Sequence, residues 1–190
     1  MTSFTLDTNC IYAVAKGEAD ALFVRALAEA HATGAARVAI VAISASENQP
    51  GGSLLTGFAQ FQSNMASLGL GHLEELKPLA VWDVTFWDWC LWGNEAMSAL
   101  ERRIHAVLFP QVEYELAGYC QRHGVRPDWP LPRGWRNAKC DVLALWSHIH
   151  HGQEVFVTSD GNFHAPTKKP ALLALGAGEI CRPIEAVSFI

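Results

Sequence analysis

The stretch "SFTLDTN", residues 3–9, is a short apolar run that ends in a carboxylate, Asp7. The later stretch "EVFVTSD", residues 154–160, has the same plan and ends in Asp160. Both runs have the length and the apolar content of short buried strands. Because the carboxyl ends of parallel strands meet at one edge of a sheet, where ligands of α/β proteins bind, we expect the two aspartates to share a site.

The rest of the chain alternates strand-like and helix-like segments. "RVAIVAI", residues 37–43, is apolar at nearly every position, as in a strand that is covered on both faces, and "LAVW", residues 79–82, is predicted as a short strand. Helical spacing of apolar residues predicts helices over about 18–34, 54–68, 94–108, 111–122, 138–152 and 168–176. This alternation predicts an α/β fold, a three-layer α/β/α sandwich with a mainly parallel central sheet.

Length and composition predict one domain that covers residues 1–190, because half of the 190 residues are hydrophobic and 17% are charged. No apolar run approaches the roughly 18 residues that a membrane span needs, and the N-terminus lacks the plan of a signal peptide. We therefore expect a cytoplasmic protein with no membrane partner. The five cysteines are scattered singly, which argues against a disulfide framework and a thiolate zinc site.

Positive charge is concentrated in "QRHGVRPDWPLPRGWRNAKC", residues 121–140, although the whole chain has a net charge of −5, which gives no overall electrostatic footprint for nucleic acid. Prolines and glycines predict a loop here, and tryptophans interleave with the basic side chains. We expect this loop to contact RNA phosphates through Arg122, Arg126, Arg133, Arg136 and Lys139. An equally weighted interpretation is a solvated connection that its tryptophans hold against the core.

Two further acids are expected at the edge that carries Asp7 and Asp160. Glu47 follows the second predicted strand, and Asp141 stands near the start of the helix that leads into the strand at 154–158. Clustered carboxylates repel one another unless some are protonated or a cation neutralises them. Oxygen ligands favour Mg²⁺ or Mn²⁺, and such ions support phosphodiester hydrolysis. Taken singly, each acid also fits a turn, a helix N-terminus or a solvated surface.

These motifs together resemble the PIN-domain family, metal-dependent ribonucleases that include the toxins of many bacterial toxin-antitoxin pairs. The matching motifs are "LDTN", "ISASE", "NAKCDVLAL" and "VTSDGNF", which follow one another between Leu6 and Phe163. The resemblance implies a PIN-like fold whose catalytic acids are Asp7, Glu47, Asp141 and Asp160. It implies that all of these except Glu47 bind Mg²⁺ or Mn²⁺, and that hydrogen bonds from Asn9, Ser159 and Asn162 support them.

The resemblance also implies a function, a metal-dependent endoribonuclease that hydrolyses RNA and serves as the toxin of a toxin-antitoxin pair. An RNA substrate, an antitoxin protein and a second copy of the chain are then the expected partners. Three alternatives stay open: an inactive module that binds RNA or protein, cleavage of DNA, and an aspartyl-phosphate nucleophile at Asp7. The last is disfavoured because that chemistry needs a second aspartate two residues on, where this chain has Asn9.

The middle of the chain, about residues 50–136, is longer than in minimal toxin-like members of the family. It contains the tryptophan-rich segment 82–92, for which packing is the first expectation and a stacking or partner surface the second. If Glu47 is not the fourth acid, its substitutes are Asp83, Asp88 and Glu95. The histidines of "HIHH", residues 148–151, are expected to end a helix rather than to bind metal.

Overall fold

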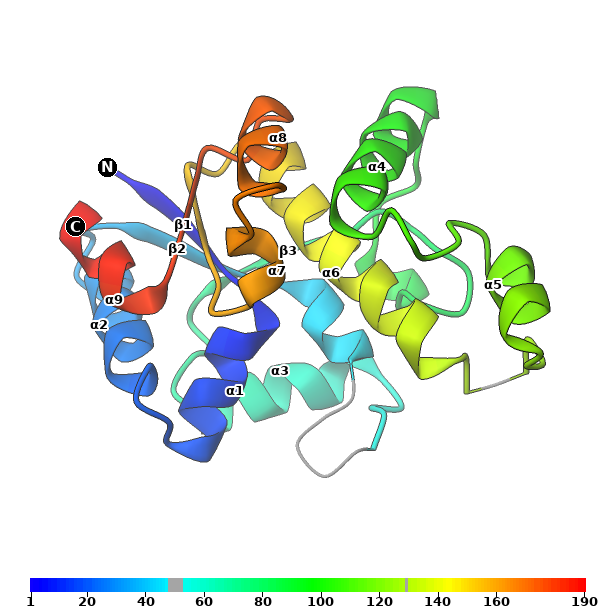
Figure 1. The fold of residues 1–190 in the computed structure, drawn as a ribbon. Coiled ribbons are helices and arrows are strands. Elements are labelled where there is room, and N and C mark those ends of the chain that lie inside the picture. The colour runs from blue at the N-terminus through cyan, green and yellow to red at the C-terminus, as the bar shows by residue number, and fades with distance from the viewer. Residues whose placement is uncertain (48–52, 129) are drawn as a thin grey trace.

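The computed structural model describes residues 1–47, 53–128 and 130–190, and its centre is a five-stranded sheet in the order β3-β2-β1-β4-β5 (Figure 1). All neighbouring strands are parallel, which confirms the predicted α/β class. The strands are β1 (Ser3–Leu6), β2 (Arg37–Val41), β3 (Glu74–Leu76), β4 (Val155–Val157) and β5 (Glu179–Cys181). Since the first strand is central, the end of β1 lies between the ends of β2 and β4.

Helices cover both faces of the sheet and make the three layers that the sequence predicts (Figure 1). On one face lie α1 (Thr8–Lys16), α2 (Ala21–Ala32), α3 (Phe58–Ser67) and α9 (Pro183–Ala186). On the other lie α4 (Glu95–Leu108), α6 (Arg133–His150), α7 (Gly161–His164) and α8 (Lys169–Ala174). The remaining helical segments are η1 (Ala42–Ser46), η2 (Trp87–Trp89), α5 (Leu116–His123) and η3 (Val187–Phe189).

The period-two alternation of side chains along the strands separates the two cores. Phe4 and Leu6 of β1 point into the core beneath α1, α2 and α3, while Phe156 of β4 points into the core beneath α6. Thr5 faces the α6 side, where its hydroxyl lies 2.9 Å from Nδ1 of the fully buried His148. The short strands are thus fixed in register by burial on both faces.

The prediction of a strand at residues 79–82 is wrong, because the strand at this edge of the sheet is β3. β3 escapes apolar pattern matching because it is short and begins with Glu74 and Glu75, which suit an edge strand facing water. Residues 79–82 lead into a tight turn, in which the amides of Val84 and Thr85 donate to the carbonyl of Val81. Asp83 in that turn has a φ of 57°, a conformation that aspartate tolerates better than most residues.

The prediction of a loop over residues 121–140 is wrong for its second half, most of which belongs to α6. α5 ends at Gly124, whose φ of 63° stops the helix, and α6 already begins at Arg133 after Pro132. Proline suits the start of a helix as well as it suits a loop, which explains the misplaced boundary. No helix within the described ranges has both the length and the apolar character needed to cross a membrane.

Candidate active site

Asp7 occupies the junction between β1 and α1, where it caps the helix. Its Oδ1 accepts from the amide of Thr8 at 2.8 Å, and its Oδ2 accepts from Asn9 Nδ2 and Thr158 Oγ1, each at 2.7 Å. Only 3% of the residue is exposed. Three neutral donors therefore hold a buried carboxylate in one orientation at the carboxyl end of the central strand.

Asp160 takes the corresponding place after β4, where its Oδ1 accepts from the amide of Asn162 at 2.8 Å. Thr158 joins the two aspartates, because its hydroxyl donates to Asp7 and accepts from the amide of Asp160 at 3.1 Å. Asn9 completes the junction: its Oδ1 accepts from the amide of Ser159 at 2.9 Å. The ends of β1 and β4 are thereby tied together, as the repeated strand-to-aspartate pattern predicts.

Glu47 follows η1, the short helix that continues from β2. Its Oε1 accepts from Thr8 Oγ1 at 2.5 Å, and the same threonine oxygen lies 2.7 Å from Ser44 Oγ. Thr8 thus positions the glutamate on the sheet edge that carries Asp7. The proposed substitutes for Glu47, namely Asp83, Asp88 and Glu95, are exposed and do not line the cavity at this sheet edge that contains Asp7 and Glu47.

Asp141 is contributed by α6 rather than by a strand. It lies eight residues into the helix and not near its start as the sequence indicates, yet it faces the same cavity. The cavity has a volume of about 280 Å³. It is lined by Asp7, Thr8, Asn9, Tyr12, Glu47, Asp141, Ser159 and Asp160. The structure therefore brings the four acids of the sequence prediction together.

Burial and the charges of nearby acids raise the pKa values of Asp7, Glu47 and Asp141. Burial raises the pKa of Asp7 to about 6, and the nearby Asp160 adds to the rise. Burial, with Asp7 second, raises the pKa of Glu47 to about 8, while Thr8 and Arg136 oppose that rise. The pKa of Asp141 is also raised, first by burial and then by the charges of its three acidic neighbours. The cavity thus favours either protons or a bound cation.

The donor set fits a hard divalent cation by its chemistry, because the converging side chains are carboxylates, and the pKa values of Asp7, Glu47 and Asp141 are raised. Asp7, Asp141 and Asp160 would hold such an ion. Within the described residues, no three Asp, Glu, His or Cys side chains are already placed as a set of metal ligands. Both oxygens of Asp7 accept hydrogen bonds from protein groups, and binding of an ion at Oδ2 requires the Asn9 or Thr158 side chain to yield.

Two of the three predicted supporting residues point elsewhere with their side chains. Ser159 Oγ donates to Asp20 Oδ2 at 2.6 Å, and Asn162 Oδ1 accepts from Lys168 Nζ. Both contribute through the backbone instead, Ser159 to Asn9 and Asn162 to Asp160. Asn9 is the supporting residue whose side chain contacts an acid of the cavity.

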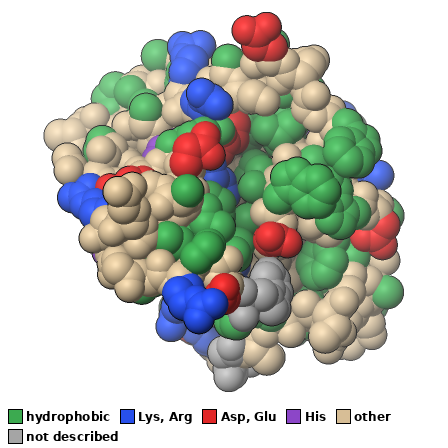
Figure 2. All heavy atoms as spheres, turned by 90° about the vertical axis from the view of Figure 1, so that its right-hand side faces the viewer, with side chains coloured by type: hydrophobic (Ala, Val, Ile, Leu, Met, Phe, Trp, Pro, Cys, Tyr) green, Lys and Arg blue, Asp and Glu red, His purple; other side chains and the backbone are tan. Residues whose placement is uncertain are grey.

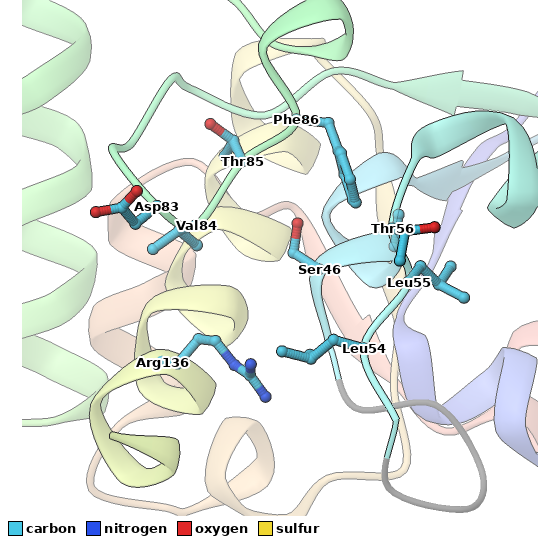
Figure 3. Close-up of a pocket in the computed structure, with 10 residues that line it drawn as sticks. Ser46, Leu54, Leu55, Thr56, Asp83, Val84, Thr85, Phe86 and Arg136 are labelled. Carbon is cyan, nitrogen blue, oxygen red and sulfur yellow. The ribbon is translucent and has the colours of Figure 1, made fainter. Parts of the chain in front are cut away.

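The basic residues predicted to contact RNA divide into buried and exposed groups. Lys139 is 4% exposed and its Nζ lies 2.9 Å from Oε1 of the buried Glu101, so it belongs to the interface of α4 and α6. Arg136 is 3% exposed and lines a separate cavity (Figure 3). A buried lysine in an ion pair offers no ammonium to a phosphate, and the expectation that Lys139 lies on an open loop is wrong.

The other three arginines are exposed. Arg122 pairs with Glu113 at 2.5 Å and Arg126 pairs with Asp128 at 2.9 Å, while Arg133 starts α6. Trp135 is buried and its Nε1 donates to the carbonyl of Tyr114, whereas Trp129 lies outside the described residues. These three exposed arginines keep their predicted place on the surface.

The tryptophan-rich segment divides in the same way. Trp89 packs on Phe58 with the ring centroids 4.7 Å apart, as the packing interpretation expects. Trp82 and Trp92 are 74% and 75% exposed, and both contact the ring of Trp87. Figure 2 shows the end of the molecule that carries α4 and α5, with large hydrophobic side chains at the surface beside a hollow.

The histidines at the end of α6 have structural partners. Nε2 of His148 lies 2.9 Å from the carbonyl of Ala177, and burial lowers the pKa of His148 to about 4. His150 stacks on Trp146, and His151 lies 3.1 Å from the carbonyl of Lys77. These contacts agree with the expectation that "HIHH" ends a helix.

Sequence reasoning missed two residues that line the cavity, Thr8 and Tyr12, and also Thr158, which is not part of the lining but donates to Asp7. Thr8 and Thr158 each follow or precede a predicted acid by one or two positions, in "LDTN" and "VTSD". A threonine hydroxyl both donates and accepts, which suits a residue that links two polar groups. Tyr12 lies one turn of α1 beyond Thr8 and therefore on the same side of the helix.

No protein-family model matches the sequence, and no curated protein matches it. Among solved structures, the chain is similar to a crystal structure of VapBC2 from Rickettsia felis bound to a DNA fragment from their promoter. The identity is 18% and the TM-score is 0.43, over 95% of this chain and 98% of that chain. A likeness this weak carries no argument about function.

Proposed function

We propose that this chain is a metal-dependent endoribonuclease that hydrolyses phosphodiester bonds at the cavity between the ends of β1, β4 and η1. The observation that supports the proposal most is the convergence of Asp7, Glu47, Asp141 and Asp160 on one cavity of about 280 Å³. Clustered carboxylates with raised pKa values are typical of catalytic sites. Packing of the core does not by itself require four acids in one place.

Each acid has a distinct part in this proposal. Asp7, Asp141 and Asp160 would hold Mg²⁺ or Mn²⁺, which when bound supplies positive charge for the phosphate and lowers the pKa of water. Glu47, whose pKa is raised to about 8, would exchange a proton with the attacking water near neutral pH. Thr8 holds Glu47, and Asn9 and Thr158 hold Asp7, so that the reacting groups keep their geometry.

The choice of RNA, and the role of toxin with an antitoxin partner, come from the resemblance of the sequence motifs to the PIN-domain family. The exposed Arg122, Arg126 and Arg133 would contact RNA phosphates. A homodimer and a cytoplasmic location belong to the same proposal.

A second candidate keeps the fold and the RNA contacts without turnover. It is favoured by the three hydrogen bonds that Asp7 already accepts and by the lack of a ready set of metal ligands among the described residues. This candidate predicts RNA binding that does not depend on Mg²⁺ or Mn²⁺.

Cleavage of a mixed RNA pool by purified protein tests the proposal, with Mg²⁺, Mn²⁺ or EDTA in parallel. We expect metal-dependent cutting that Asp7→Asn or Asp160→Asn lowers by more than about 100-fold, because even indirect supports of metal ligands cost 10- to 100-fold. Asp88→Asn is the matched control, an exposed aspartate outside the cavity, and it should cut like the wild type. Full activity of Asp7→Asn would overturn the proposal, and RNA binding without cutting would favour the second candidate.

A further inference from the structure

A second cavity (Figure 3) is larger than the acidic one and has a volume of about 550 Å³. Its walls come from the end of η1, residues 54–56, the turn and segment at 83–86, and the first turn of α6. This volume is in the range of small-molecule and cofactor sites, which are mostly apolar with a few placed polar groups.

The two cavities are close together, although no described residue lines both. Ser46 of the larger cavity directly precedes Glu47 of the acidic one, and Arg136 precedes Asp141 by five residues on α6. Arg136 is close enough to Glu47 to lower its pKa against the effect of burial. A group in the larger cavity would therefore lie beside a phosphate held at the acids.

The lining combines an apolar surface with the buried cation of Arg136 and the exposed carboxylate of Asp83. Figure 3 shows Leu54, Phe86 and Arg136 extending into the space around Ser46, whose hydroxyl also points inward. Arg136 is 3% exposed, so its guanidinium meets a ligand in surroundings where a hydrogen bond is strong. The hydroxyl of Thr85 is taken by the backbone of Val81, from which it accepts at 3.0 Å and to which it donates at 3.1 Å.

We propose that the larger cavity binds one nucleobase of single-stranded RNA, next to the phosphate that is cut. This inference rests on the proposed nuclease function. Phe86 and Leu54 contact the flat face of the base, and the guanidinium of Arg136 donates to its edge. Because the forked donors of arginine match the O6 and N7 acceptors of guanine, while adenine presents a donor at the former position, guanine is the preferred base.

Two substitutions test the cavity without removing its buried arginine charge. Leu54 is half-exposed, and Leu54→Trp fills part of the cavity with an indole ring. Leu22→Trp on α2, at a leucine that is 61% exposed, is the control. Arg136→Lys keeps the charge but loses the fork of donors. Circular dichroism checks that each variant is folded.

Binding of 5′-GMP and 5′-AMP, followed by saturation-transfer NMR, is the first readout. We expect the wild type and Leu22→Trp to prefer GMP by at least about fivefold, since one good bidentate contact gives discrimination of that size. Leu54→Trp should lose binding of both nucleotides, and Arg136→Lys should lose the preference. Equal binding by the wild type and Leu54→Trp, a preference for AMP, or no nucleotide binding would overturn the proposal.

Cleavage separates this proposal from the nuclease function. Leu54→Trp should lower kcat/KM for RNA at least about fivefold more than for bis(p-nitrophenyl) phosphate, a diester without a base. Cuts by the wild type should show guanine at one fixed position beside the cleaved bond. If the wild type hydrolyses neither substrate, the nuclease function fails, while GMP binding that Leu54→Trp removes still supports the cavity. Hydrolysis of both substrates with no base preference would overturn the cavity alone.

Discussion

Buried carboxylates occur in two settings in this protein, and α6 contributes to both. Lys139 of α6 reaches Glu101 on α4, where Nζ and Oε1 are 2.9 Å apart and both side chains are at most 5% exposed. Two residues later, Asp141 faces a cavity that also holds Asp7, Glu47 and Asp160. One helix therefore contributes Lys139 to a compensated ion pair and Asp141 to a cluster of acids.

The first setting shows how this fold stabilises a buried acid for structural purposes. Glu101 accepts from Lys139 and from the Tyr114 hydroxyl, and the ammonium of Lys139 also lies 3.8 Å from the centre of the Tyr114 ring. In the second setting Asp7 has neutral donors, and burial, with a smaller contribution from Asp160, raises its pKa. The proposed function would account for this difference, because a cation from outside the chain would neutralise the acidic cavity.

Matched amide substitutions should produce the largest difference between the two settings. Glu101→Gln leaves Lys139 as a buried cation without its counter-charge and should lower the free energy of unfolding by about 3 kcal/mol. Glu47→Gln removes a repelling charge and should raise the stability of the metal-free protein at pH 8. Urea unfolding in EDTA measures both, and a loss of similar size in Glu47→Gln would remove the distinction.

The pH dependence of stability should sharpen the comparison. The folded-state pKa values of Asp7 and Glu47 are raised to about 6 and about 8, from ordinary values of 3.8 and 4.5. The folded state then binds more protons than the unfolded state between about pH 4 and 8, so metal-free stability falls as pH rises through this window.

Thermal unfolding in EDTA at steps from pH 4.5 to 9 measures this fall. In Glu47→Gln, the contribution of Asp7 to the fall in stability should end near pH 6. The stability of this variant should therefore decline less than that of the wild type above pH 6. Stability of the wild type that stays level or rises between pH 5 and 8 would contradict the raised pKa values.

Of the predicted changes, loss of the Asn9 side chain should have the smallest effect. Asn9→Ala removes the donor to Asp7 and the acceptor for the Ser159 amide, but leaves Thr158 on Asp7. We expect RNA cleavage to fall about 10- to 100-fold, with an apparent affinity for Mn²⁺ that falls in step. An unchanged rate would mean that Asn9 does not position Asp7 for the reaction.

Much of the fold follows from the sequence because the central strands combine burial with period-two alternation. Ser3–Leu6 and Val155–Val157 are such strands, and each runs into its aspartate as predicted. The edge strands β3 and β5 escape detection, since each has three residues and includes glutamate. Pairing with an existing strand, rather than local pattern, fixes these edges.

The sequence predicts the acids of the site but not the residues that contact them. Strand ends place Asp7 and Asp160, but nothing local shows that Thr8 reaches Glu47 across 39 positions or that Lys139 finds Glu101 across 38. The proline-rich approach to α6 likewise conceals that Arg136 lies inside a helix and lines a cavity. Long-range partners of polar side chains depend on the packing of whole helices, which composition and spacing do not encode.

Titration of Mn²⁺ into the metal-free protein at pH 8, followed by calorimetry, tests the central claim most directly. Asp88→Asn, at an exposed aspartate that does not line the cavity, serves as the control. The account predicts saturable binding by the wild type and by Asp88→Asn, and its loss in Asp141→Asn and Asp160→Asn with the fold retained. Binding of equal strength in Asp141→Asn, or none in the wild type, would contradict the assignment of the acidic cavity as a metal site.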